Sequence, residues 1–151
     1  MKLNFRSVQF EDSSTILIWR NLSESREAST QSEAISNDEH LKWFSSRIKR
    51  IDLEPYLIFF LDNIPVGTCR LDLNRENQNE FIVSIIVDPI YRKLGIGEII
   101  FGLTYETYLS GSNKVIIANV LKSNLPSRRL FSKLGFEIDK ISNNFIKYKK
   151  L

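Results

Sequence analysis

The chain has 151 residues, of which 42% are hydrophobic and 26% are charged, and its formal net charge is +3. This size and composition predict one globular domain, residues 1–151, with a core of its own. The modest charge does not favour a nucleic-acid partner, and no apolar stretch approaches the roughly 20 residues of a membrane helix. Cys69 is the only cysteine, so no intramolecular disulfide can form, and residues 1–6 lack the apolar core of a signal peptide. We therefore expect a cytoplasmic protein.

The first third of the chain mixes strand-like and helical patterns. Alternating residues 3–8 predict a strand, and the polar run 12–14 can cap a helix that ends near residue 21. Residues 21–34 are polar and irregular, which predicts a loop or a broken helix. The capping-box pattern of residues 36–39 then begins a second helix, with Leu41, Phe44 and Ile48 on one face.

Strand patterns dominate the rest of the chain. Apolar and β-branched runs predict strands at 56–61, 66–73, 80–87, 114–120, 136–138 and 145–149. One helix is predicted from the glycine-bearing turn near residue 95 to about Ser110, and another from Asn124 to a C-cap at Gly135. An antiparallel meander thus precedes strand–helix–strand units. This order predicts an α/β (α+β) fold with a mixed, mostly antiparallel central sheet flanked by about four helices.

The most informative motif is Arg-x-x-Gly-x-Gly, from Arg92 to Gly97, between a predicted strand and a predicted helix. Free backbone N–H groups and the positive end of the helix dipole meet there, which suits a phosphate or pyrophosphate. The two glycines would let a ligand approach the backbone. Similar turns also occur in folds that bind nothing there. A dinucleotide fingerprint is excluded because Ile100 stands where its third glycine belongs, and the chain has no Walker A sequence.

Two motifs and the order of elements resemble the GNAT superfamily of acetyl-CoA-dependent N-acetyltransferases. Arg92–Gly97 matches the family's Arg/Gln-x-x-Gly-x-Gly/Ala pyrophosphate loop, and the preceding Val87-Asp88-Pro89 is also typical. The later run from Asn124 and Ser127 to Leu134-Gly135-Phe136 is similar to the family's second motif. The resemblance covers nearly the whole chain.

This resemblance implies a binding site for acetyl-CoA as the acetyl donor, and no metal. The backbone amides of one loop would cradle the pyrophosphate: Arg92, Lys93, Leu94, Gly95, Ile96, Gly97 and Glu98. The backbone of Ile86 and Val87 would pair with the pantetheine arm and polarise the thioester carbonyl. The second motif, with Asn124 and Ser127, would contact the pantetheine or adenosine end, and Arg128 or Arg129 the 3′-phosphate. The alternatives to these ligand contacts are that Asn124 is only a loop residue and that both arginines lie on a solvated helix face.

The family usually transfers the acetyl group by direct attack of the amine within a ternary complex. Its usual general acid, a tyrosine, is replaced by Phe131, so the thiolate must leave unassisted, take a proton from water or use another group. Ile82 stands at the usual place of a catalytic glutamate. Glu80 shares its strand face and either acts through a water or is an ordinary strand-end carboxylate. Ser84 on the same face could hold a water.

Acceptor choice in this fold is usually set by the first helices, where four polar or aromatic residues are candidates: Trp19, Arg20, Asn21 and Arg26. The region resembles N-acetyltransferases of bacterial nonulosonic acid pathways, such as that of pseudaminic acid, which act on a 4-amino sugar carried on UDP. Related patterns occur in ribosomal-protein N-acetyltransferases. The arginines suit a diphosphate or a carboxylate, and an indole of Trp19 or Trp43 could stack on an acceptor ring or pack in the core. His40, the only histidine, is either a base or substrate contact or a satisfied helix residue.

Three functions therefore compete. The first is N-acetylation of a small-molecule amine, best a nucleotide-linked aminosugar. The second is acetylation of protein N-termini or lysines, and the third is a non-catalytic CoA-binding module, which Phe131 keeps open. No nucleic-acid or membrane partner is expected, and a homodimer is expected by analogy with the fold.

Overall fold

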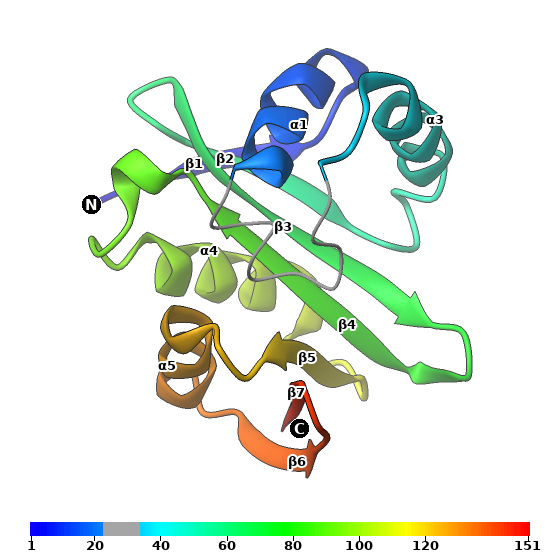
Figure 1. Ribbon diagram of the computed structural model, residues 1–151, viewed down its shortest axis with the longest axis vertical. Coiled ribbons are helices and arrows are strands. Elements are labelled where there is room, and N and C mark those ends of the chain that lie inside the picture. The colour runs from blue at the N-terminus through cyan, green and yellow to red at the C-terminus, as the bar shows by residue number, and fades with distance from the viewer. Residues whose placement is uncertain (23–33) are drawn as a thin grey trace.

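The computed structural model describes residues 1–22 and 34–151. They form one seven-stranded sheet in the order β1-β2-β3-β4-β5-β7-β6 (Figure 1). The strands are β1 (Asn4–Ser7), β2 (Tyr56–Leu61), β3 (Ile64–Asn74), β4 (Asn77–Val87), β5 (Val115–Leu121), β6 (Glu137–Ile141) and β7 (Phe145–Lys150). Neighbouring strands are antiparallel except β4 and β5, which are parallel. The predicted mixed, mostly antiparallel sheet is confirmed.

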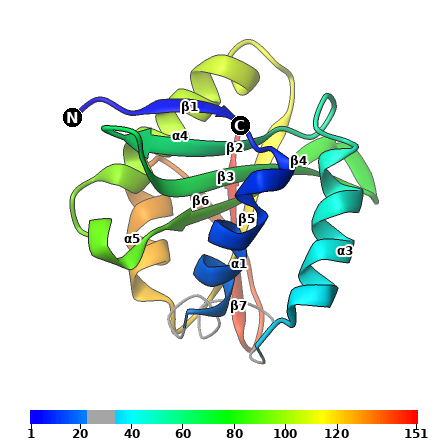
Figure 2. The same ribbon diagram turned by 90° about the horizontal axis from the view of Figure 1, so that it is seen from above.

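In the described part of the chain, four α-helices cover the two faces of the sheet in pairs. They are α1 (Ser13–Asn21), α3 (Asn37–Ile48), α4 (Ile96–Thr104) and α5 (Leu125–Lys133). Helices α1 and α3 lie on one face, and α4 and α5 lie on the other (Figures 1 and 2). None of these helices is long and apolar enough to cross a bilayer.

Each face has its own hydrophobic core because side chains alternate along the strands. On β2, Leu57 and Phe59 pack on the side of α4 and α5, whereas Tyr56 and Ile58 pack against α1 and α3. The same alternation on β3 buries Cys69 and Leu71 in the α4–α5 core. It therefore turns Arg70, which lies between them, and Asp72, which follows them, towards α1 and α3.

Helix α3 begins as predicted, because Ser36 Oγ accepts a hydrogen bond of 3.1 Å from the Glu39 amide. The face that it buries differs from the predicted one. Phe44 is buried and Ile48 is partly buried against the same core, but the fully buried neighbours of Phe44 on the helix are His40 and Arg47, and Leu41 is not part of this core. Periodicity could not reveal this, because the two buried polar side chains are satisfied by partners far away in the sequence.

The later helices and hairpin deviate slightly from the predicted boundaries. The α-helical part of α4 ends at Thr104, and one turn of π-helix, Tyr105–Leu109, completes the predicted helix. Strands β3 and β4 extend into the predicted polar turn, to Asn74 and from Asn77.

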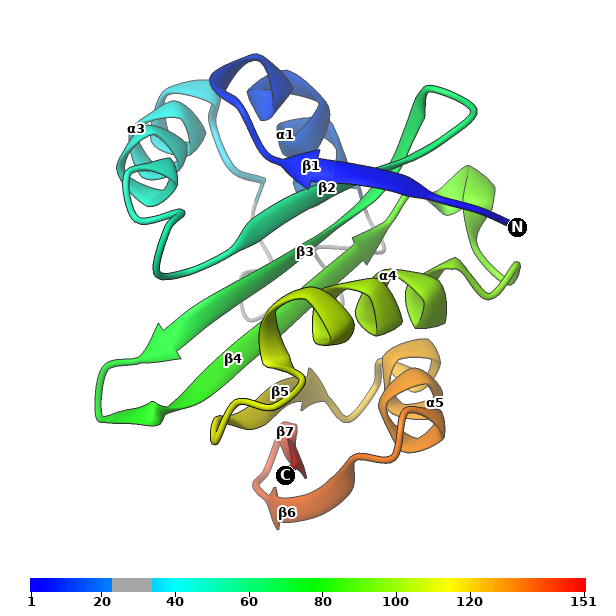
Figure 3. The same cartoon turned by 180° about the vertical axis from the view of Figure 1, so that it is seen from behind.

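Strands β4 and β5 separate at the place that matters most for function. Only Glu80, Phe81 and Ile82 of β4 pair with β5, opposite Val115–Ile117. Beyond this point β4 continues beside β3 as far as Val87, which pairs with Gly67. Figure 3, the view from behind, shows that β4 and β5 diverge and that α4 and α5 lie beside them. The edge of β4 from Val83 to Val87 thus has no strand partner on the β5 side within the described residues.

Candidate active site

The loop after β4 is fastened to the sheet by Asp88. Its amide donates to the Val66 carbonyl at 2.8 Å, and its Oδ1 accepts from the Ile90 amide at 2.9 Å. The side chain of Arg92 returns to the end of β4, where its Nε donates to the Val87 carbonyl at 3.2 Å. The loop is therefore held against the unpaired end of β4.

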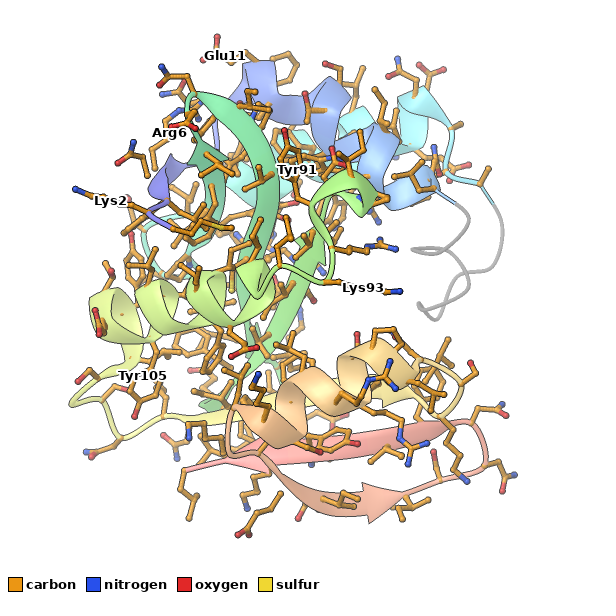
Figure 4. All side chains as sticks on the ribbon, turned by 90° about the vertical axis from the view of Figure 1, so that its left-hand side faces the viewer. Lys2, Arg6, Glu11, Tyr91, Lys93 and Tyr105 are labelled. Atoms are coloured by element: carbon orange, nitrogen blue, oxygen red, sulfur yellow. The ribbon has the colours of Figure 1, made fainter. Side chains whose placement is uncertain are left out.

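Helix α4 starts without a side-chain cap. Its N-cap is Gly95, with φ of +79°, and no side chain accepts from the first turn. The amides of the first turn, at Ile96, Gly97 and Glu98, therefore have no helical partner. Lys93 points outward from the loop before them (Figure 4). Free amides, a helix dipole and a basic side chain together fit a phosphate group.

Gly95 and Gly97 have different roles in this loop. Gly95 has a positive φ that a side chain would oppose, with open space around it. At Gly97 an added Cβ would come within 3.2 Å of Leu130 Cδ2 on α5. The missing side chain of Gly97 thus also lets α4 and α5 approach each other, and the expectation that both glycines admit a ligand stays a prediction. Lys133 on α5 also pairs with Glu98 on α4 at 3.1 Å.

The second predicted motif forms the start of α5. Asn124 is the N-cap, and its Oδ1 accepts from the Ser127 amide at 3.2 Å. Its side-chain Nδ2 has no partner in the described ranges, whereas its backbone amide donates to the Leu121 carbonyl at 2.9 Å. Arg128 Nη1 donates to the Lys122 carbonyl at 3.1 Å and so supports the loop before the helix. Arg129 is exposed and forms no ion pair with the described residues, so of the two it is the one available for a ligand phosphate.

On the opposite face, α1 carries three of the predicted acceptor residues. Trp19 is buried, and its Nε1 donates to Asp88 Oδ2 at 3.0 Å. Its ring therefore packs in the core instead of facing an acceptor. The side chain of Asn21 is held by both the amide and the carbonyl of Ile35, at 2.7 and 2.8 Å. Asn21 thus ties together the two ends of the segment between α1 and α3. Arg26 lies outside the described residues.

Arg20 on α1 contacts His40 on α3. Arg20 Nη1 lies 3.1 Å from His40 Nδ1, and His40 Nε2 lies 3.0 Å from the Ser13 carbonyl. Since a guanidinium can only donate, Nδ1 is the acceptor and Nε2 carries the proton. Burial and the Arg20 charge lower the pKa of His40, and the hydrogen bond to Ser13 only partly opposes them. The imidazole is therefore neutral, buried and fully hydrogen-bonded.

Arg70 is a further charged residue of this region that the motifs did not reveal. It extends from β3 to the same place as Arg20, and both guanidinium groups lie over the Trp43 ring, 4.4 Å from its centroid for Arg20 and 5.0 Å for Arg70. Arg70 also pairs with Asp72 at 2.8 Å and lies 3.4 Å from Ser84 Oγ. The available signal was the pair of charged residues, Arg70 and Asp72, inside an otherwise apolar strand.

Residues 17–136 match the model of the acetyltransferase (GNAT) family. The chain belongs to this family. It is therefore an acetyl-CoA-dependent N-acetyltransferase by family, and the predicted resemblance, fold and donor are confirmed at that level.

Solved structures share the fold over nearly the whole chain. One is yncA, a putative acetyltransferase from Salmonella typhimurium with acetyl-CoA (16% identity, 98% of this chain and 92% of that one, TM-score 0.79). Another is a ribosomal-protein-alanine N-acetyltransferase from Brucella melitensis (18%, 98% and 99%, TM-score 0.82). A third is AAC(6')-Ib in complex with ribostamycin and coenzyme A (16%, 99% and 92%, TM-score 0.82). No curated protein matches the sequence.

The family's donor fits the features described above. An uncapped helix start with Lys93 beside it suits the pyrophosphate, and the unpaired edge of β4 suits an extended arm that needs backbone partners. Within residues 1–22 and 34–151, no group of three or more His, Cys, Asp or Glu side chains is arranged to hold a metal ion.

The family's usual acid position, Phe131, contains no proton donor and lies in the core. Its ring packs against Phe136 and Tyr148, with centroids 5.0 and 6.3 Å away. Tyr105 lies at the end of α4 remote from the loop (Figure 4). Cys69 is fully buried, and burial raises the pKa of its thiol to about 12, so it remains protonated and inert.

Two of the predicted catalytic residues of this GNAT chain lie at very different distances from the open end of β4. Glu80 precedes Ile86 by six residues, about 20 Å along the strand, which exceeds the reach of one bridging water. It lies where β4 is still paired with β5, and Asn74 Nδ2 donates to its Oε1 at 2.9 Å. Ser84 lies two residues from Ile86 on the same face, about 7 Å along the strand. The geometry thus favours Ser84 over Glu80.

Proposed function

We propose that this cytoplasmic enzyme acetylates a primary amine on an anionic small molecule, best represented by a 4-amino sugar on a nucleotide diphosphate. The observation that carries this proposal is Arg20, whose half-buried guanidinium lies over Trp43 and pairs with no carboxylate among the described residues. A partly desolvated cation on the acceptor side favours an acceptor that brings a negative charge.

The donor side of the reaction would use mainly backbone groups. The amides from Arg92 to Glu98 would bind the pyrophosphate, and Asn124 and Arg129 would bind along the rest of the donor. Ile86 and Val87 would align the arm and polarise the reacting carbonyl with backbone N–H groups. Bound acetyl-CoA supplies an acetyl group activated as a thioester.

The acceptor nitrogen would attack the carbonyl carbon directly, so that a C–N bond forms and the C–S bond breaks. A covalent enzyme intermediate is not needed, which agrees with the buried, protonated Cys69. With Phe131 at the usual acid position, the thiolate would leave unassisted and take its proton from water, since its pKa of about 8.5 makes it a good leaving group. Ser84 would hold the water that receives the amine proton.

Donor binding is tested first, by calorimetric titration of the protein with acetyl-CoA. We expect saturable binding, and its absence at millimolar ligand would contradict the donor assignment. Release of free thiol is then measured with a UDP-linked 4-amino sugar, a panel of peptides and an aminoglycoside. The proposal predicts the highest kcat/KM with the sugar nucleotide.

The other outcomes have clear meanings. Preference for a peptide would assign the chain to protein N-acetylation, and CoA binding without thiol release from any amine would indicate a binding module. Aminoglycosides are polycations, so we expect the arginines of the acceptor side to reject them. The homodimer remains a prediction, which sedimentation of the protein would check.

A further inference from the structure

A group of three arginines gathers on the α1–α3 face of the sheet, each from a different element. Arg20 comes from α1, Arg47 from α3 and Arg70 from β3. Arg20 and Arg70 both lie over Trp43, and Arg47 lies over Tyr56 with its Cζ 5.4 Å from that ring's centroid. Three cations are thus held close together by aromatic rings.

Within the described residues, Asp72 is the one carboxylate that forms an ion pair with this group, and it pairs with two of the three arginines. Asp72 Oδ1 pairs with Arg47 Nε at 2.8 Å, and Asp72 Oδ2 pairs with Arg70 Nε at 2.8 Å. Arg47 is fully buried and also donates to the carbonyls of Glu54 and Leu71. Arg47 is therefore satisfied, but the positive charge of Arg20 and Arg70 exceeds what Asp72 compensates.

The side chain that orients Arg20 is neutral. His40 accepts from Arg20 through Nδ1 and is fixed in turn by Ser13, so it positions the guanidinium without cancelling its charge. Burial and the Arg70 charge lower the pKa of Arg20. Burial also lowers the pKa of Arg70, but Asp72 and Tyr56 outweigh it, so the net direction is upward. The pKa therefore falls at Arg20, which has no carboxylate partner among the described residues, and rises at Arg70, which has Asp72.

We propose that Arg20 and Arg70, held over the Trp43 ring, form the subsite that binds an oxyanion of the acceptor. The inference rests on the proposed function and adds which residues bind the negative charge of the acceptor. Both side chains are partly exposed, with Arg20 half-buried and 23% of the Arg70 side chain exposed. Two adjacent guanidinium forks suit the oxygens of a phosphate or a carboxylate. Trp43 keeps the forks in place, so little side-chain freedom is lost on binding.

The register of the sheet fixes the spacing between this subsite and the chemistry. Arg70 pairs across the strands with Ser84, and Ser84 lies one repeat, about 7 Å, from Ile86 on the same face. The spacing along β4 favours an acceptor that carries its anion several bonds from its amine. An α-amino acid, whose carboxylate is one carbon from the amine, suits this spacing less well. A diphosphate across a sugar ring from the amine has suitable reach.

The test uses the full-length protein saturated with CoA, so that the start of α4 is already occupied. Binding of UDP, inorganic pyrophosphate and succinate is measured by calorimetry for the wild type and for Arg20→Met and Arg70→Met. We expect each substitution to weaken anion binding about tenfold or more, because a hydrogen-bonded charge is lost. Comparison of pyrophosphate with succinate distinguishes a phosphate from a carboxylate as the natural anion.

The matched control is Arg6→Met on β1. Arg6 also lies over an aromatic ring, that of Phe60, and pairs with Asp12 at 2.7 Å, but its side chain forms no described contact with Trp43. Its loss should leave anion affinity unchanged. Asp72 keeps Arg47 as a partner in Arg70→Met, so we expect this variant to fold, and its retained CoA affinity checks that.

Wild-type protein that binds CoA but none of the three anions at millimolar concentration would overturn the subsite. Unchanged anion affinity in both arginine variants would also overturn it. Failure to bind CoA would instead contradict the proposed function, so the two failures are distinguishable. Binding of succinate alone would support the oxyanion subsite and exclude the nucleotide acceptor.

Discussion

At the scale of single residues, His40 illustrates how burial decides what a titratable group can do. A lone histidine in the acceptor region was a candidate base. Its two ring nitrogens are occupied by Arg20 and Ser13, and its side chain is fully buried. A base needs a free lone pair that reaches the substrate. His40 therefore fits a positioning role, in which it fixes Arg20 while remaining uncharged.

This role predicts a pH dependence of stability. The pKa of His40 is lowered in the folded state, so the unfolded chain binds more protons below its own value of about 6.5. The free energy of unfolding should be highest above pH 6.5 and fall as the pH drops towards the folded pKa. The slope cannot exceed about 1.4 kcal/mol per pH unit. Urea unfolding between pH 7.5 and 5.5 measures it.

The variant His40→Asn provides the comparison. Asparagine keeps an acceptor near Arg20 but does not titrate, so the slope should disappear over this range. The variant should be less stable by about 1 kcal/mol at pH 7.5, since the bond to Ser13 is lost. His40 is the only histidine in the chain. A slope that persists in the variant would show that another group is responsible.

At the scale of elements, most of the fold could be predicted because each pattern was local. Strands, caps and turn residues specified the sheet and all four described helices. The donor loop was also local, since one short run contains both the glycine and the basic residues. What could not be predicted depends on contacts between distant segments. Arg70 contacts Trp43, and Trp19 contacts Asp88, only in the folded chain, because the members of each pair lie far apart in the sequence.

Gly97 and Gly102 on α4 give a matched prediction about one such contact. The substitution Gly97→Val should force α4 away from Leu130, since a Cβ there already comes within 3.2 Å. We expect a loss of about 1–3 kcal/mol in the free energy of unfolding. Acetyl-CoA binding should weaken at least about fivefold, because the amides at the start of α4 move. Calorimetry and thermal unfolding measure both effects.

The control is Gly102→Ala on the same helix, where an added Cβ meets nothing within 4 Å. Alanine should stabilise the helix by about 0.5–1 kcal/mol and leave acetyl-CoA binding unchanged. Equal affinity of the Gly97→Val variant and the wild type would mean that the α4–α5 contact does not set the geometry of the donor loop.

At the scale of the whole molecule, the sheet separates the α4–α5 side, to which we assign the donor, from the α1–α3 side, to which we assign the acceptor. One core packs under α4 and α5, and the other packs under α1 and α3. Among the described residues, one hydrogen bond links α1 to the donor loop, from Trp19 Nε1 to Asp88 Oδ2 at 3.0 Å. Asp88 is also bonded to Ile90 and Val66, so it belongs to the loop. This bond therefore fixes α1, with Arg20, relative to the donor loop.

The substitution Trp19→Phe removes this bond but keeps a buried ring. We expect a loss of about 1–2 kcal/mol in the free energy of unfolding, because a charged acceptor loses its donor. Affinity for acetyl-CoA should change little, since Asp88 keeps its bonds to the loop. The acceptor KM should rise several-fold, because α1 no longer holds Arg20 at a fixed position relative to the donor loop. Steady-state kinetics with the acceptor identified above measures the change.

The control removes a different buried hydrogen bond, on the other side of the sheet. Thr104 Oγ1 donates to the Ile100 carbonyl within α4 at 2.8 Å, and Thr104→Val deletes that bond at nearly constant volume. Its effect should be limited to stability, with the acceptor KM unchanged. If Trp19→Phe behaves in the same way, the Trp19–Asp88 bond is a fold contact alone. Each variant loses one hydrogen bond, but the two bonds lie on opposite sides of the sheet. If only Trp19→Phe raises the acceptor KM, the alignment of α1 with the donor loop depends on the Trp19–Asp88 bond.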